Sequence, residues 1–145
     1  MPAHVHDAMS TVVLTIGPAH TLRQAAHLMS VRRVGAAVVL DPDTSGIGIL
    51  TERDILNSLG TGENPDEERA HDHTTTDVVF ATPVWTLDAA AEAMTRGGFR
   101  HLIVLDEHEP VGILSVRDIV RNWSETGAPV APAPPADRAA DALTP

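Results

Sequence analysis

The 145 residues of this chain, 43% of them hydrophobic, are enough for one core of ordinary domain size and leave no room for a separate catalytic domain. A formal net charge of -10 argues against binding to the nucleic acid backbone or to an anionic membrane, because both need clustered basic residues. All ten basic residues are arginine and cysteine is absent, which excludes lysine Schiff-base chemistry, a Walker-type lysine, disulfides and thiolate zinc sites. Without a membrane-spanning apolar run or a signal sequence at Met1, we expect a soluble, cytoplasmic protein.

The first predicted elements form one supersecondary unit. In its first helix, Leu22, Ala25 and Met29 recur at helical spacing, and Thr21 before them is an N-cap residue. Two β-rich runs separated by a turn follow and predict a hairpin. The unit is a strand, a helix, two hairpin strands and a final helix, predicted over 12–16, 21–31, 35–40, 47–50 and 51–59.

The same unit returns about 65 residues later. Met29 is matched by Met94, and the segment 48–55 is matched by the segment 112–119. Such a period indicates one unit used twice, and two such units bury their apolar faces against each other. We therefore predict a mixed α+β or α/β fold of two βαββα repeats packed with pseudo-twofold symmetry, with a ligand groove between them. The second set of elements is predicted over 78–81, 86–96, 102–105, 111–114 and 115–123.

The segments outside these elements differ in composition. We place repeat 1 at 1–59, an acidic linker at 60–76, the core of repeat 2 at 77–123 and a disordered Ala/Pro-rich tail at 124–145. Within the linker, residues 64–69 are a candidate for a short helix. The tail is rich in proline and has too little apolar surface to order itself.

The segment from Gly48 to Asp54, GILTERD, and the segment from Gly112 to Asp118, GILSVRD, resemble the G-x-x-T/S-x-x-D signature of CBS domains, the cystathionine-β-synthase motif. The run 99–106 is similar to the second-strand pattern of bacterial CBS pairs, with Ile103 where proline is commoner. Two signatures at matching positions of a duplicated frame support each other. The resemblance covers roughly 4–123 and implies a tandem CBS pair, or Bateman module, of the stand-alone bacterial type.

The resemblance also implies a function. Two pseudo-twofold clefts would bind an adenosine-containing ligand such as AMP, ADP, ATP or S-adenosylmethionine, with no resident cofactor. The module would form a homodimer and regulate an unidentified partner protein. We expect no catalytic residue and no enzyme, because Asp54 and Asp118 lack a positioned nucleophile. A different class stays open, namely a dimeric interaction module without a ligand, in which the signature residues serve only as helix caps.

The signature residues have two interpretations. A Ser or Thr followed three residues later by an acidic residue is a capping box, which needs no ligand. In the ligand-binding interpretation, the hydroxyls of Thr51 and Ser115 contact ribose or phosphate at a helix N-terminus, while Asp54 and Asp118 accept hydrogen bonds from the ribose. The two interpretations are compatible, because a carboxylate has acceptor capacity for both.

Phosphate would be met by cations, and repeat 2 offers the fuller set in Arg100, His101 and Arg117. A surface ion pair is the alternative for Arg100. At the positions of Arg100 and His101, repeat 1 has Gly35 and Ala36; its cleft keeps Arg53 and gains Arg32 and Arg33, and Gly35 joins the candidate ligand contacts. The resemblance places the adenine against the first strand and the residues before the second strand, which are Thr15, Ile16 and Val34 in repeat 1 and Phe80, Ala81 and Phe99 in repeat 2.

Two histidine pairs invite a metal interpretation. His4 and His6, and likewise His71 and His73, alternate in the sequence as ligands on one face of a strand would. Each segment supplies only two histidines and one aspartate, which is too few for a closed zinc site. We therefore predict no metal site from these segments.

Overall fold

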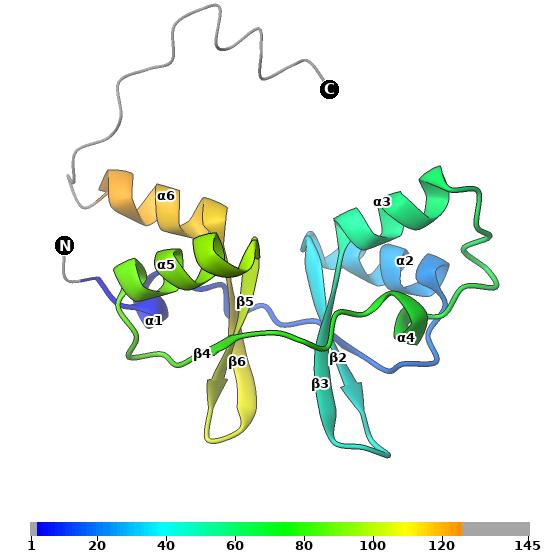
Figure 1. Cartoon of the computed structure of the whole chain (residues 1–145), viewed down its shortest axis with the longest axis horizontal. Helices are drawn as coiled ribbons and strands as arrows, with labels where there is room; N and C mark the ends of the chain where they lie inside the picture. The colour runs from blue at the N-terminus through cyan, green and yellow to red at the C-terminus, as the bar shows by residue number, and fades with distance from the viewer. Residues whose placement is uncertain (1–2, 126–145) are drawn as a thin grey trace, which may run out of the picture.

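Two three-stranded sheets face each other at the centre of the molecule, and the helices lie on their outer sides (Figure 1). The computed structural model describes residues 3–125. The predicted order of strand, helix, hairpin and helix is confirmed in both repeats. The elements are α1 (Val5–Ala8), β1 (Thr15–Ile16), α2 (Leu22–Arg32), β2 (Ala36–Asp41), β3 (Gly46–Thr51), α3 (Glu52–Gly60), α4 (Ala70–His73), β4 (Phe80–Ala81), α5 (Leu87–Gly97), β5 (His101–Asp106), β6 (Glu109–Ser115) and α6 (Val116–Glu125).

The C-terminal helix α6 reaches into the segment that we predicted as a tail. It includes residues 124 and 125, and the rest of the predicted tail, 126–145, lies outside the described residues. Within the described part of the chain, no helix is both long and apolar enough to cross a membrane.

In each sheet the first strand of the hairpin is central, with its hairpin partner on one side and a short parallel strand on the other. In repeat 1, β1 pairs with β2 in parallel and β2 pairs with β3 in antiparallel register; β4, β5 and β6 repeat this order. The second hairpin turns at Glu107 and His108, both with positive φ, as in a two-residue primed turn, and has an irregularity between Val104 and Leu105. The second turn is two residues shorter than the first, and the irregularity adds one residue to β6, so the repeat offset falls from 65 to 64 residues in the signature.

Polar caps fix where the long helices begin. The predicted N-cap Thr21 accepts a hydrogen bond from the Gln24 amide at 3.1 Å, and Thr86 accepts one from the Ala89 amide at 3.1 Å. Arg33 follows the last residue of α2 and Gly98 follows that of α5, and both residues are in the left-handed region that stops a helix. The two equivalent helices therefore begin and end at equivalent positions.

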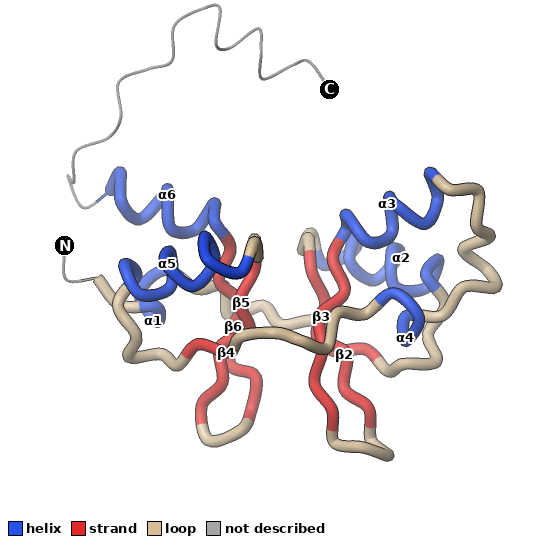
Figure 2. Tube along the Cα trace, viewed as in Figure 1, coloured by secondary structure: helices blue, strands red, loops and turns tan. Residues whose placement is uncertain are grey.

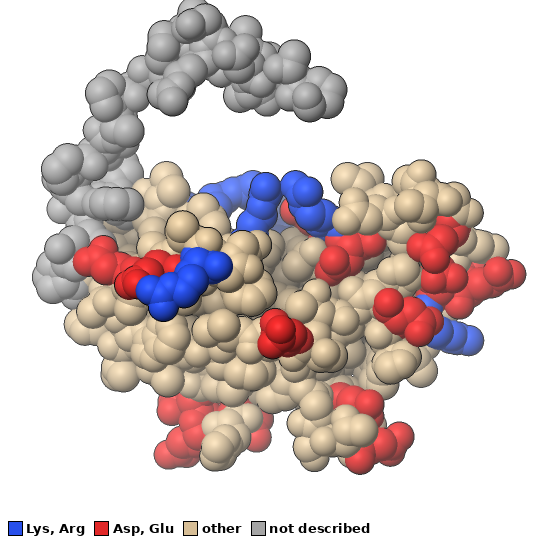
Figure 3. Space-filling view, viewed as in Figure 1, with Lys and Arg blue, Asp and Glu red and all other residues tan. Residues whose placement is uncertain are grey.

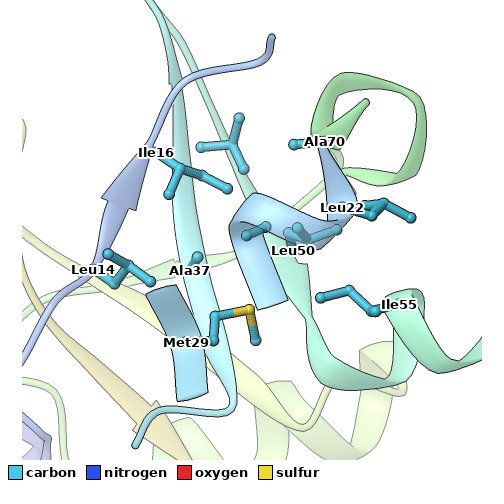
Figure 4. Close-up of a cluster of buried hydrophobic side chains, with 10 residues drawn as sticks. Leu14, Ile16, Leu22, Met29, Ala37, Leu50, Ile55 and Ala70 are labelled. Atoms are coloured by element: carbon cyan, nitrogen blue, oxygen red, sulfur yellow. The ribbon is translucent and has the colours of Figure 1, made fainter. Parts of the chain in front are cut away.

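Three apolar clusters hold the molecule together. In the first, Leu22 and Met29 of α2 pack on Ile16 and Leu50 of the first sheet (Figure 4). The second is its equivalent between α5 and the second sheet. The third lies between the two sheets, so the prediction that the repeats bury their apolar faces against each other is confirmed; its buried members are Ala36, Val38, Ile49, Ile103 and Ile113.

The short leading helices are exchanged between the repeats. Helix α1 lies at the start of repeat 1 but packs on the second core, where Val5 is fully buried, and α4 packs on the first core through the fully buried Ala70 (Figure 1). The connections after α1 and α4 then cross between the two halves (Figure 2). The short helix expected within 64–69 is only a single turn, in which the amides of Glu67 and Glu68 both bond to the Asn64 carbonyl. The helix in this region is α4 instead.

The signature glycines permit these crossings. Ser10 forms a bridge pair with Ile113, and Thr75 forms the equivalent pair with Ile49. A Cβ atom on Gly48 would lie 2.4 Å from Thr74 Cγ2 and 2.8 Å from the Thr75 carbonyl oxygen. A Cβ atom on Gly112 would be crowded in the same way by the Met9 side chain and the Ser10 carbonyl oxygen. Only glycine leaves room for a crossing backbone so near the strand.

Candidate functional site

Two clefts lie between the repeats, and residues from both repeats line each of them. Cleft 1 has a volume of about 780 Å³ and combines the repeat 1 signature residues with the turn between α5 and β5. Cleft 2, of about 550 Å³, combines the repeat 2 signature residues with the turn between α2 and β2. Both volumes are typical of small-molecule sites.

The structure brings most of the predicted residues together in these clefts. Cleft 1 is lined by Thr51, Arg53, Asp54, Phe99, Arg100 and His101, and cleft 2 by Val34, Gly35, Arg100, His101, Ser115, Arg117 and Asp118. The predicted convergence of two guanidinium groups and an imidazole beside Asp118 is therefore present.

Our grouping of the other residues by repeat is wrong. Arg33, Val34 and Gly35 lie in cleft 2 with Asp118, and Phe99 lies in cleft 1 with Asp54. The physical reason is that the sheets face each other. The start of the second strand in one repeat is thereby placed against the signature helix of the other repeat.

Four residues expected to contact the base lie in neither cleft. Ile16 and Ala81 face the helices and belong to the first and second cores, at 3% and 0% exposure. Phe80 packs against the core between the sheets, and Thr15 is exposed. Strands β1 and β4 are two-residue strands on the side of the central strand opposite β3 and β6. They therefore lie away from the signature helices.

Sequence reasoning missed other cleft residues. Ile49 and Thr75 line cleft 1, and their equivalents Ile113 and Ser10 line cleft 2 together with Arg121. Strand alternation could have found the two isoleucines, because each lies two positions before the Thr or Ser of its signature and shares its face. Ser10 and Thr75 come from the crossing segments, which the sequence pattern does not place.

Both capping boxes are formed, which confirms the structural interpretation of the signature. The Thr51 amide donates to Asp54 Oδ2 at 2.8 Å, and the Asp54 amide donates to Thr51 Oγ1 at 3.3 Å. Ser115 and Asp118 repeat this at 2.9 Å and 3.1 Å. The backbone amide uses Oδ2 of each aspartate, so the Oδ1 atoms retain acceptor capacity for a ligand.

Positive charge gathers in cleft 2. Four of the ten arginines line it, namely Arg33, Arg100, Arg117 and Arg121, and the Arg121 guanidinium lies 3.7 Å from Asp118 Oδ1. Figure 3 shows basic atoms gathered at the upper edge between the two halves, whereas acidic atoms are spread over the rest of this face. In a chain of net charge -10, such a local group of cations focuses an attractive potential for anions on one cleft.

His101 lies at the start of β5, borders both clefts and is surrounded by charges. Burial lowers the pKa of its imidazole, and the cations Arg100 and Arg117 act in the same direction. The carboxylates of Glu52 and Asp118 oppose this effect. Because burial is the largest contribution, the neutral imidazole is favoured, and it offers one donor and one acceptor to a ligand.

A pair of βαββα units with composite clefts between facing sheets defines a paired-repeat module. The CBS domain family model matches residues 5–61 and 70–125, and the chain belongs to the CBS domain family. The chain is 30% identical to the CBS domain-containing protein YhcV of Bacillus subtilis over 118 residues, which cover 81% of this chain and 84% of YhcV. It is 31% identical to the protein MJ1225 of Methanocaldococcus jannaschii but spans only 41% of that protein.

Solved structures of CBS proteins have the same fold as this chain. The CBS-domain containing protein ATU1752 from Agrobacterium tumefaciens is 32% identical, covers 83% of this chain and 93% of its own, and superposes with a TM-score of 0.72. The CBS domain pair of protein MJ0100, solved in complex with 5-methylthioadenosine and S-adenosyl-L-methionine, is 22% identical, with coverages of 83% and 99% and a TM-score of 0.73. The predicted tandem CBS pair with the Bateman-module fold is confirmed.

Proposed function

We propose that this chain is a regulatory module that binds an adenosine nucleotide between its two repeats and acts on a partner protein. One observation carries the proposal: in cleft 2 a carboxylate with a spare oxygen, Asp118, lies among four arginines and the half-buried imidazole of His101. A nucleotide needs an acceptor for its ribose hydroxyls and cations for its phosphates, and cleft 2 offers both. The role assigned to the clefts is binding and not catalysis.

Each part of a nucleotide has a counterpart in cleft 2. The ribose hydroxyls donate to Asp118 Oδ1, and the phosphates meet the guanidinium groups and the N-terminus of α6. The base lies against apolar side chains at the rim, Val12 and Val34. That the MJ0100 domain pair was solved with two adenosyl compounds supports this ligand class.

Cleft 1 offers a weaker version of the same site. Asp54 is held in an equivalent capping box, and Phe99 supplies an apolar surface for the base. Only two arginines, Arg53 and Arg100, line this cleft. Since phosphate binding depends on the number of cations, we propose cleft 2 as the principal site and cleft 1 as the secondary one.

The second candidate function is a dimeric interaction module without a ligand. Two observations favour it: the capping boxes are closed by residues of the chain alone, and α3 and α6 expose large apolar side chains, Leu56 at 67%, Val116 at 43% and Val120 at 57%. A homodimer would cover such side chains. Light scattering at micromolar concentration tests the dimer, and a mass near 15.4 kDa would contradict it.

A thermal-shift panel separates the two candidates. The melting temperature is measured with AMP, ADP, ATP and S-adenosylmethionine, and with GMP and inorganic phosphate as comparison ligands. A ligand at about one hundred times its Kd adds about 2.7 kcal/mol to the free energy of unfolding, so a rise of several degrees is expected with at least one adenosyl compound. No rise with any of them at millimolar concentration would favour the ligand-free module.

A further inference from the structure

A cluster of metal-ligating side chains lies outside the candidate base and phosphate contacts, where the chain between α3 and α4 folds back on α3. Glu63, Glu68 and His73 contribute it, and their ligand atoms all lie within 4.8 Å of one another. His73 Nε2 is 2.8 Å from Glu68 Oε1 and 4.0 Å from Glu63 Oε1. The sequence pattern had paired His73 with His71 instead, but His71 is exposed and is not part of this cluster.

The local structure holds these three side chains in place. The His73 side chain is only 17% exposed and that of Glu68 is 27% exposed. Glu63 Oε1 accepts a hydrogen bond of 2.9 Å from the hydroxyl of Ser58, a residue of α3 that is 3% exposed. The fully buried Ala70 anchors α4, the helix that carries His73, in the first core. The cluster therefore has the supporting hydrogen bond and packing that orient metal ligands.

A simple ion pair does not account for the whole arrangement. One carboxylate is enough to pair with the imidazole, and Glu68 already does so. Glu63 brings a second carboxylate to the same point, and two carboxylates this close repel each other unless positive charge lies between them. A protonated imidazole supplies one positive charge, whereas a divalent ion supplies two and binds all three side chains.

We propose that Glu63, Glu68 and His73 bind a divalent transition-metal ion of the Zn²⁺ type, with water in the remaining coordination positions. Zinc bonds of about 2.0 to 2.2 Å place tetrahedral ligands roughly 3 to 4 Å apart. His73 Nε2 lies 2.8 Å and 4.0 Å from the two carboxylates, and no two of the three ligand atoms are more than 4.8 Å apart, so small side-chain rotations complete the site. The imidazole favours Zn²⁺ over Mg²⁺ and Ca²⁺, which prefer ligand sets made of oxygen alone.

The position of the cluster gives the ion a structural effect. A cavity of about 260 Å³ adjoins it, lined by Glu63 and His73 on one side and by Asp54, Asn57 and Ser58 of α3 on the other. The ion would tie the connection 61–73 to α3, the helix whose first turn carries Asp54 of cleft 1. A metal that binds only the folded chain also raises its stability.

The test is a titration of the chelator-treated full chain with Zn²⁺, in competition with a chromophoric chelator. We expect one saturable equivalent and a higher melting temperature in Zn²⁺ than in EDTA. His73→Ala and Glu68→Gln should each weaken binding at least tenfold. The matched controls are His71→Ala and Glu67→Gln, which change the same residue types at exposed neighbouring positions; both should bind as the unmodified chain does.

Two further measurements keep the outcome unambiguous. His4, His6 and Asp7 form a second, more exposed group, so the titration is repeated in the His6→Ala background, where the equivalent should remain. A melting curve in EDTA shows whether each variant is folded, and Glu63→Gln replaces any variant that is not. The proposal is overturned if the chain binds no Zn²⁺, or if folded His73→Ala, Glu68→Gln and Glu63→Gln variants bind it as tightly as the controls.

Discussion

The aspartate of each signature has one observed role, in the helix cap, and one proposed role, in ligand binding, and the two roles use different oxygen atoms. Its Oδ2 closes the capping box, and its Oδ1 can face a ligand. Asp54 and Asp118 are equivalent in this respect. Their surroundings differ, because Asp118 lies among four arginines whereas cleft 1 has two. The difference between the clefts therefore resides in the residues around an identical motif.

Asp118→Ala should weaken nucleotide binding more than Asp54→Ala does. Losing a charged acceptor from a partly buried site costs about 1.5 to 3 kcal/mol, or roughly a 10- to 150-fold rise in Kd. Calorimetric titration of both variants measures the effect, with Asp88→Ala, an exposed aspartate in the first turn of α5, as the matched control. If Asp54→Ala abolished binding and Asp118→Ala left it intact, cleft 1 would be the principal site.

His101 should make the free energy of unfolding depend on pH. Since burial lowers the pKa of His101, the unfolded chain binds more protons than the folded chain between that pKa and the ordinary histidine value of about 6.5. Stability therefore rises with pH across this window and is lost as the pH falls below about 6.5. Urea unfolding from pH 5 to 7.5 should show a flatter profile for His101→Gln than for the exposed control His27→Gln. Identical profiles would contradict the burial of an uncharged imidazole.

At the scale of elements, the exchange of α1 and α4 joins the two repeats into one unit. Each crossing segment pairs with the signature strand of the other repeat, at Ile49 and Ile113. Each then passes beside a signature glycine, Gly48 or Gly112. The glycine of the motif is thus required by the backbone packing, independently of any ligand.

Gly48→Ala should destabilise the fold by about 1 to 3 kcal/mol, because the new methyl group overlaps the Thr75 carbonyl and the Thr74 side chain. Gly60→Ala at the end of α3 is the matched control, since a Cβ there meets nothing within 4 Å. That change should be neutral or slightly stabilising. Chemical denaturation measures both, and equal stability of the two variants would show that the crossing segment moves aside easily.

Val5→Ala tests the exchange itself. Val5 lies at the start of repeat 1 in the sequence but is fully buried in the second core, so the truncation should cost about 2 kcal/mol. Val84→Ala, at a position 73% exposed, should change stability by less than about 0.5 kcal/mol. A neutral Val5→Ala variant would mean that α1 contributes little to the second core.

The elements that the sequence predicted are those with a strong local signal. Helix α2 follows from the spacing of Leu22, Ala25 and Met29, and the hairpins follow from β-rich runs around turns. The four-residue helices α1 and α4 are too short to show a hydrophobic periodicity. They are stabilised by packing on apolar cores whose residues lie far away in the sequence. The composite clefts were missed for a related reason: Val34 reaches cleft 2 only because the sheets face each other.

In the whole molecule, the duplication places the two helices that follow the signature strands, α3 and α6, at the boundary between the repeats. Arg100 and His101 border both clefts, so a ligand in one cleft meets groups that also face the other. The apolar side chains between the sheets hold this boundary together. The regulatory role that we propose is consistent with such an arrangement, because a ligand bound between the repeats would favour one relative position of them over others.

Isothermal titration calorimetry of the purified chain with AMP and ATP tests the central claim most directly. We expect saturable binding of at least one of these nucleotides, with an affinity that falls as the salt concentration rises, because the arginines of cleft 2 would bind the phosphates. Heats indistinguishable from dilution for AMP, ATP and S-adenosylmethionine at millimolar concentration would contradict it. That result would leave the ligand-free interaction module as the function of the fold.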